Sequence, residues 1–249
     1  GLMLAPVARR RPRSTGEIRH GVAAGACLLV GFLLQTVGLR HTTSATSAFI
    51  TYLLVVAVPV IGVVRTRRPP APAVVLGVVL AVLGLVLLSG GASGFGFGEA
   101  LTVGAALAFA LHIVVLGEVA ERHDPVRLTL WQVLTVAAAC SVPGLVAPGG
   151  YRFDGGVWLA AAFCGVGATA AAFWCMTYGQ RVVPQTQAAL ILLLEPVSAG
   201  VLGALAGNRL GAAGFVGAAL ILVAVVVAEL GGPRPPGLPT ELALLPEDP

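Results

Sequence analysis

Long apolar runs separated by short polar joints dominate the chain. The runs cover residues 21–39, 46–64, 72–89, 99–117, 128–147, 157–178, 186–206 and 211–230. A helix of about 20 residues crosses the roughly 30 Å hydrocarbon core of a bilayer, so each run predicts one membrane-spanning helix. Lipid cannot hydrogen-bond to exposed backbone groups, which favours helices in every run. The pattern therefore predicts an all-α, multi-pass membrane protein with about eight transmembrane helices.

Composition removes the main alternatives. The chain is 57% hydrophobic and only 10% charged, whereas soluble domains carry about 25% charged residues. The joints, such as 65–70 and 121–125, are too short for a separate catalytic domain. We find no zinc-binding, phosphate-binding or triad signature, so we expect neither an enzyme nor a cofactor or metal site. The four cysteines lie inside apolar runs without metal-ligand spacing and predict small, unpaired buried residues.

The arginines predict an orientation. All 15 basic residues are Arg, and they stand at the ends of apolar runs rather than on one amphipathic face, which argues against nucleic acid as a partner. If the loop at 9–20 is cytoplasmic, only Arg40, Arg152 and Arg209 fall outside. Cytoplasmic loops are enriched in Arg and Lys. We therefore expect a plasma-membrane protein whose C-terminus is cytoplasmic.

An internal repeat relates the two parts of the chain. A shift of 141 residues aligns Thr36, Gly38 and Arg40 with Thr177, Gly179 and Arg181, Ala48 and Ile50 with Ala189 and Ile191, Gly62 with Gly203, and Arg68 with Arg209. The shift spans five predicted helices. Because five is odd, the two copies must enter the membrane from opposite sides, a plan that recurs in secondary transporters. Two five-helix repeats make ten helices, and this chain shows eight after an apolar stub at 1–8.

Several segments of the chain form a recognisable set of motifs: 35–39, 42–49, 108–117, 124–132, and above all 187–197 with its Leu-Glu-Pro triplet, followed by 217–222. In these segments the chain resembles the EamA-type branch of the drug/metabolite transporter superfamily. The resemblance covers residues 1 to about 230. It implies a ten-helix fold of two inverted repeats with both termini cytoplasmic, which moves small metabolites through a central cavity. The sequence departs from the family pattern at Asn208 and at Arg67, where the joints lack the usual acid.

The resemblance predicts how the chain is divided. Residues 1–90 would form an incomplete first repeat, from the end of helix 2 to helix 5. Residues 99–230 would form the second repeat, helices 6 to 10. Residues 231–249 are rich in proline, with no periodic apolar face, and predict a disordered cytoplasmic tail.

Glu195 is the main candidate for chemistry. It lies near the middle of a predicted span, where an ionised side chain is costly, so it should face a cavity or be protonated. Pro196 beside it removes a helix N–H and breaks the helix there. In such a position, Glu195 is expected either to bind a cationic group of the substrate or to carry a coupling proton. The structural alternative, a hydrogen bond between helices, stays open.

Three more residues are weaker candidates. Gln35 and Trp174 have the amide and aromatic groups that would line a substrate cavity. His112 is either a proton relay or an interhelical hydrogen-bonding residue. These residues together predict a secondary transporter of small organic metabolites working by alternating access, with a small-molecule substrate, membrane lipid and a coupling proton as partners. A homodimer, an inactive or truncated transporter fragment, and a non-transporting membrane scaffold remain open alternatives.

Overall fold

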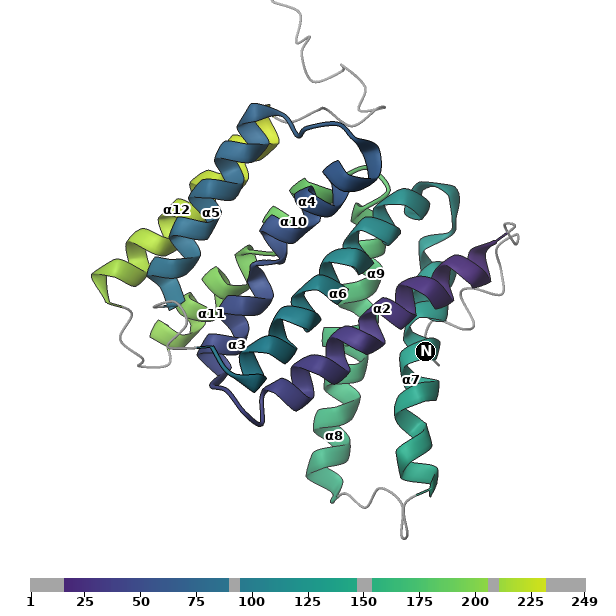
Figure 1. The fold of residues 1–249 in the computed structure, drawn as a ribbon. Coiled ribbons are helices and arrows are strands. Elements are labelled where there is room, and N and C mark those ends of the chain that lie inside the picture. The colour runs from purple at the N-terminus through teal and green to yellow at the C-terminus, as the bar shows by residue number, and fades with distance from the viewer. Residues whose placement is uncertain (1–15, 90–94, 147–153, 206–210, 232–249) are drawn as a thin grey trace, which may run out of the picture.

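The computed structural model describes residues 16–89, 95–146, 154–205 and 211–231 (Figure 1). The predicted apolar stub at 1–8, the tail from 232, and both Arg152 and Arg209 lie outside this part of the chain. Within it, every regular element is helical. The prediction of an all-α protein is therefore confirmed.

The helices follow the apolar runs closely. Single helices are α2 (Glu17–Gly38), α5 (Pro72–Ser89), α6 (Phe97–Val119), α7 (Pro125–Val146) and α12 (Ala212–Gly231). Three runs are made of consecutive pieces, namely α3 (Ser44–Tyr52) with α4 (Leu54–Thr66), α8 (Gly155–Phe163) with η2 (Cys164–Ala171) and α9 (Ala172–Gly179), and α10 (Gln185–Ile191) with α11 (Leu194–Leu205). A short turn of 3₁₀ helix, η1 (Ala120–Arg122), follows α6. Each of these eight rods, as we call the single helices and the joined pieces, overlaps one predicted run.

Five rods are long and apolar enough to cross a membrane: Glu17–Gly38, Thr46–Thr66, Phe97–Arg122, Pro125–Val142 and Gly155–Gly179. Shorter apolar helices cover Pro72–Leu88 and Ala212–Ala228. The rod formed by α10 and α11 is interrupted. The polytopic membrane fold predicted from the sequence is confirmed in this form.

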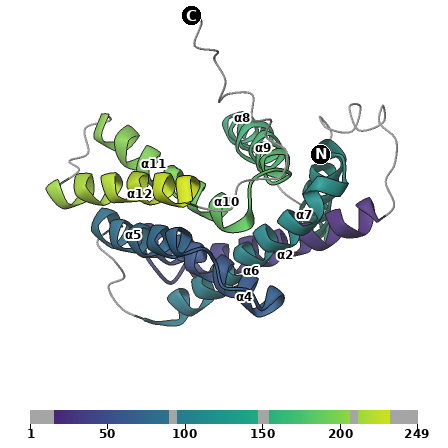
Figure 2. The same cartoon turned by 90° about the horizontal axis from the view of Figure 1, so that it is seen from above.

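The rods form two layers. Seen from above, α8 to α12 lie on one side of the molecule, and α2, α4, α5 and α6 lie on the other (Figure 2). Successive rods run in alternating directions (Figure 1). The rod α8–α9 is five rods after α2 and therefore runs the opposite way, as does α10–α11 relative to α3–α4. These directions agree with the inverted repeat.

Glycines allow the closest helix contacts. A Cβ atom added at Gly217 of α12 would lie 2.5 Å from the carbonyl oxygen of Gly84 on α5. Farther along the same pair, a Cβ at Gly77 would meet the carbonyl oxygen of Ala224 at 2.9 Å. Residue numbers rise on one helix as they fall on the other, so α5 and α12 pack antiparallel. Small residues permit this backbone approach, which supplies much of the packing energy of helices in lipid.

The cysteines differ from their prediction. Cys27 is half-buried, whereas Cys140, Cys164 and Cys175 are exposed, and all four are free thiols. The interpretation of the cysteines as buried residues was therefore wrong for these three. An apolar stretch in lipid does not need to be buried in protein, because lipid itself accommodates a thiol on the outer surface of a helix.

Candidate functional site

Two rods are interrupted near their middle, and they are partners in the internal repeat. One interruption lies at Leu53 between α3 and α4, and the other lies at Leu192–Leu193 between α10 and α11. A shift of 141 residues carries Leu53 onto Leu194, the residue directly after the second break, so the two breaks occupy nearly equivalent positions. The pieces α10 and α4 pack against each other. The two breaks therefore lie at the interface between the repeats.

The backbone at each break forms tighter bonds than an α-helix does. The amide of Leu53 donates to the carbonyl of Ile50 at 3.2 Å, and the amide of Leu193 donates to the carbonyl of Leu190 at 3.0 Å. Proline explains part of this geometry. Pro196 has no N–H, so it cannot bond to the carbonyl of Leu192. That carbonyl instead accepts from the amide of Glu195 at 3.1 Å.

Polar side chains converge on the last turn of α3. The phenol of Tyr52 and the carboxyl of Glu195 lie close enough to interact electrostatically. The side-chain amide of Gln35 donates to the hydroxyl of Thr51 at 2.9 Å. Gln35 is half-buried, and Glu195 is exposed on the protein surface. Two of the predicted site residues thus meet adjacent residues of α3: Gln35 contacts Thr51, and Glu195 lies near Tyr52, directly before the break at Leu53.

His112 lies elsewhere, in a buried polar network. Its Nε2 atom is 2.7 Å from Oε1 of Gln132 on α7, and the side-chain amide of Gln132 donates to the hydroxyl of Thr177 on α9 at 3.3 Å. The hydroxyl of Thr129 donates to Thr177 at 3.0 Å. All four side chains are at most 1% exposed. The network joins α6, α7 and α9 and shows the geometry of an interhelical hydrogen-bonding cluster.

Trp174 lies on the outer surface of α9. It is 37% exposed, and its ring centroid lies 5.9 Å from that of Tyr178 on the same helix. The guanidinium of Arg181 lies 5.9 Å from the Tyr178 centroid. These three groups form an exposed aromatic and cationic stripe along one face. Trp174 is therefore separate from the residues that gather at the end of α3.

One polar cluster was not predicted. Nδ1 of His20 at the start of α2 lies 2.7 Å from Nε2 of His123, just before α7. Nearby, Arg127 of α7 pairs with the buried carboxylate of Glu17 at 3.5 Å. Burial lowers the pKa of His123, and the neighbouring charges of His20 and Arg122 lower it further. Sequence reasoning missed the cluster because its members are about one hundred residues apart and only the packing of α2 on α7 joins them.

The site described so far contains no evident catalytic arrangement. In the described ranges, no group of three or more histidine, cysteine and acidic side chains could hold a metal ion. The arrangement has two features that suit ligand binding in a membrane. The backbone is irregular at both breaks, and the carboxyl of Glu195 lies beside the phenol of Tyr52.

Comparison with known proteins adds the family. The family model described as "EamA-like transporter family" matches residues 1–90 and 96–229. Two proteins of Archaeoglobus fulgidus, each described as an uncharacterized transporter, are similar to this chain. One is 29% identical over 215 residues, covering 86% of this chain and 70% of its own length. The other is 28% identical over 191 residues, covering 76% and 68%. A protein of known crystal structure has the same fold, with a TM-score of 0.73, 22% identity, and coverage of 92% of this chain and 82% of its own.

Proposed function

Because the chain belongs to the EamA-like transporter family, we propose that it is a secondary transporter that carries small organic metabolites across the plasma membrane by alternating access. A membrane transporter role follows from the family and from the similar transporters.

The pair of broken, repeat-related rods is the observation that carries the proposal. Transporters with inverted repeats bind substrates and coupling ions where discontinuous helices meet near the middle of the membrane. Here the breaks at Leu53 and at Leu192–Leu193 lie within two residues of equivalent positions in the internal repeat. Irregular backbone at membrane depth is tolerated where it is buried in protein or lines a polar cavity. The breaks are therefore the natural location for the substrate.

Glu195 is proposed as the binding or coupling group, and Tyr52 as the residue that positions it. Their electrostatic interaction joins α11 to α3, which belong to different repeats in this proposal. Loss or gain of a proton on Glu195 would change the charge that faces Tyr52. A group placed between two moving parts in this way can couple proton movement to their relative motion. Gln35, bonded to Thr51 one residue before Tyr52, is proposed to line the same site.

We propose that residues 1–90 and 99–230 form the two repeats and that the C-terminus is cytoplasmic. The arginine distribution supports this orientation. His112 and Trp174 are proposed only as secondary contributors, since the first is enclosed in a hydrogen-bonded cluster and the second lies on an outer surface. A homodimer and a proton as coupling ion are further proposals.

The test is transport by the purified full chain in sealed vesicles. A panel of labelled metabolites is first screened for counterflow, which needs no net proton movement. The positive substrate is then driven by an imposed pH gradient. If Glu195 couples protons, Glu195→Gln abolishes driven transport and keeps counterflow. Tyr52→Phe keeps the ring but removes the hydroxyl, and we expect it to shift the pH dependence of driven transport.

The matched control is Glu121→Gln, the same change in η1, away from the breaks. It should leave both activities intact. Unchanged driven transport in Glu195→Gln contradicts the coupling role. If a panel of organic cations, anions and zwitterions gives no counterflow with the wild-type chain, a non-transporting scaffold becomes the better interpretation.

A further inference from the structure

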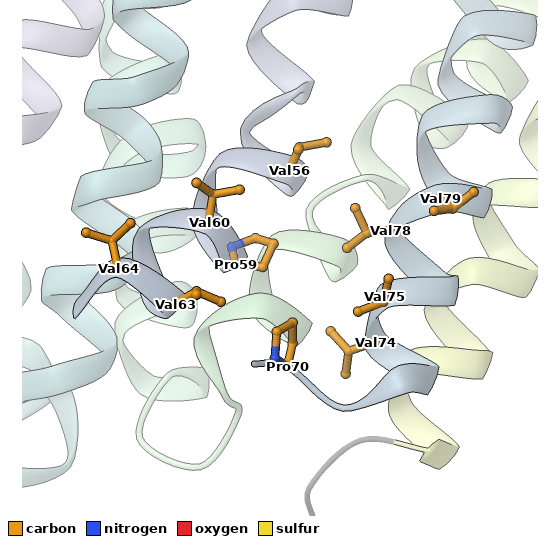
Figure 3. Close-up of a pocket in the computed structure, with 10 residues that line it drawn as sticks. All are labelled: Val56, Pro59, Val60, Val63, Val64, Pro70, Val74, Val75, Val78 and Val79. Carbon is orange, nitrogen blue, oxygen red and sulfur yellow. The ribbon is translucent and has the colours of Figure 1, made fainter. Parts of the chain in front are cut away.

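An apolar groove lies between α4 and α5, separate from the breaks. It has a volume of about 320 Å³ and is lined by eight valines and two prolines, Pro59 from α4 and Pro70 from the joint that follows (Figure 3). Figure 3 shows the valines of both helices lining this space. Its volume is at the lower end of the range of ligand pockets. With a lining of this kind, the groove offers a polar metabolite no hydrogen-bonding partner.

Arginines stand at one end of the groove. Val64 and Pro70 both line it, and the joint between them carries Arg67 and Arg68, which are exposed. Arg67 ends α4 in the left-handed conformation, with φ of 58°. Arg65, two residues before Arg67, pairs with Glu118 of α6 at 2.8 Å. Among the described residues, Arg67 and Arg68 have no acidic partner. Two exposed arginines without an acidic partner in the described part of the chain therefore lie in the joint between two groove-lining residues.

We propose that this groove binds one anionic phospholipid, with an acyl chain between α4 and α5 and the phosphate-containing head group at Arg67 and Arg68. The groove runs from Val56 to Val64, two turns of helix, or about 12 Å. That depth holds part of an acyl chain that enters from the leaflet next to the arginines. Basic groups beside a gap between transmembrane helices are a physical basis for recognition of anionic head groups.

The two parts of the site play different roles. An acyl chain has similar apolar surroundings in the groove and in the bilayer, so the groove alone gives little selection among lipids. The arginines supply selection for charge, because each basic residue near the membrane surface favours an anionic lipid about fivefold. Arginine also forms paired hydrogen bonds with a phosphate group, unlike a simple point charge. Preference for an anionic over a neutral head group is thus the property to measure.

The experiment uses the delipidated full chain in detergent and counts bound lipid by native mass spectrometry. The two probes, palmitoyl-oleoyl phosphatidylglycerol and palmitoyl-oleoyl phosphatidylcholine, share acyl chains and differ in head-group charge. We expect the anionic lipid to bind one per chain with at least a tenfold preference. Arg67→Gln with Arg68→Gln should remove most of that preference. Arg40→Gln, which changes an exposed arginine at the opposite ends of the rods, is the matched control and should keep it.

A second arm tests the groove. Val60 and Val75 both line it and are 55% and 46% exposed, so phenylalanine at either position fills the groove without crowding the protein core. Val60→Phe and Val75→Phe should each weaken lipid binding at least fivefold. Val216→Phe on α12, where Val216 is 53% exposed and outside the groove, should not.

Three outcomes overturn the proposal. If both lipids bind equally, or if the double arginine variant keeps its full preference for the anionic lipid, the arginines do not recognise the head group and only set the orientation of the chain in the membrane. Unchanged binding in both phenylalanine variants shows that no acyl chain occupies the groove. If glycerol phosphate displaces the anionic lipid at equal concentration, the site takes a soluble anion and no acyl chain is needed. The phospholipid proposal is supported if the double arginine variant loses its preference and the two groove variants lose affinity while both control variants keep normal binding.

Discussion

Replacing Gly217 with alanine should separate α5 from α12. The added Cβ would lie 2.5 Å from the carbonyl oxygen of Gly84, 2.6 Å from the amide nitrogen of Leu88 and 3.0 Å from the Cβ of Leu87. The first two are backbone atoms, which cannot turn away as a flexible side chain can. The two helices must therefore move apart along this contact and weaken the packing around it.

The size of the effect follows from two opposing terms. Overpacking of a tight contact costs about 1–3 kcal/mol. Alanine is favoured over glycine inside a helix by about 1 kcal/mol, so the net loss is up to about 2 kcal/mol. For a chain of 150–250 residues, each kcal/mol lowers the melting temperature by roughly 2–4 °C. We therefore expect a decrease of up to about 8 °C.

The matched control is Gly62→Ala in α4, where an added Cβ meets nothing within 4 Å. It should hold or raise the melting temperature through helix propensity alone. The measurement is thermal unfolding of the purified chain in one detergent, followed by size-exclusion chromatography of the soluble fraction. If the melting temperature of the Gly217→Ala variant equals or exceeds that of the Gly62→Ala variant, α5 and α12 do not touch through their backbones.

Three further predictions concern the rest of the chain. Single cysteines at positions 40 and 67 in a cysteine-free chain should react with a membrane-impermeant thiol reagent from opposite sides of the membrane. Labelling of both positions from the same side would contradict the predicted topology. Stability should decrease as pH falls below about 6.5, because the lowered pKa of His123 makes the folded state bind fewer protons than the unfolded state. His123→Gln should flatten that decrease in a pH series of melting curves, and an unaltered slope would assign it to another group. Gln132→Leu removes the partner of His112 and should lower the free energy of unfolding by about 0.6–1.7 kcal/mol, measured in an SDS unfolding titration. Ser141→Ala is the control, because the Ser141 hydroxyl bonds to the backbone of its own helix, and it should lower the free energy of unfolding by almost nothing. Equal losses in the two variants would contradict a stabilising network.

The positions of the helices were predictable from the sequence, and their interruptions were less so. Apolar runs bounded by arginine, glycine and proline identify spans because lipid imposes length and composition on each one. The break at Leu53 carries no such signal, since neither glycine nor proline lies beside it. The π-helical stretch η2 between α8 and α9 also follows from no local pattern. Both depend on how the rods meet in three dimensions.

The candidate residues divide in the same way. Glu195 was found because an acid inside an apolar run is costly wherever the helix packs. Its contact with Tyr52 could not be predicted, because the two residues are brought together only when α11 lies against α3. The same holds for His112 and Gln132. A sequence shows which side chains need a partner, and only the packing shows which partner they find.

The antiparallel contact of α5 with α12 has a further consequence for how this protein is assembled. These helices are equivalent members of the two repeats, and equivalent surfaces that pack antiparallel have the geometry of a twofold symmetric dimer interface. Two separate five-helix chains would form such an interface only when their concentration in the membrane exceeded a dissociation constant. Here both surfaces belong to one polypeptide, so their association is intramolecular. The contact is therefore insensitive to expression level, and dilution of the protein in lipid should not separate the halves.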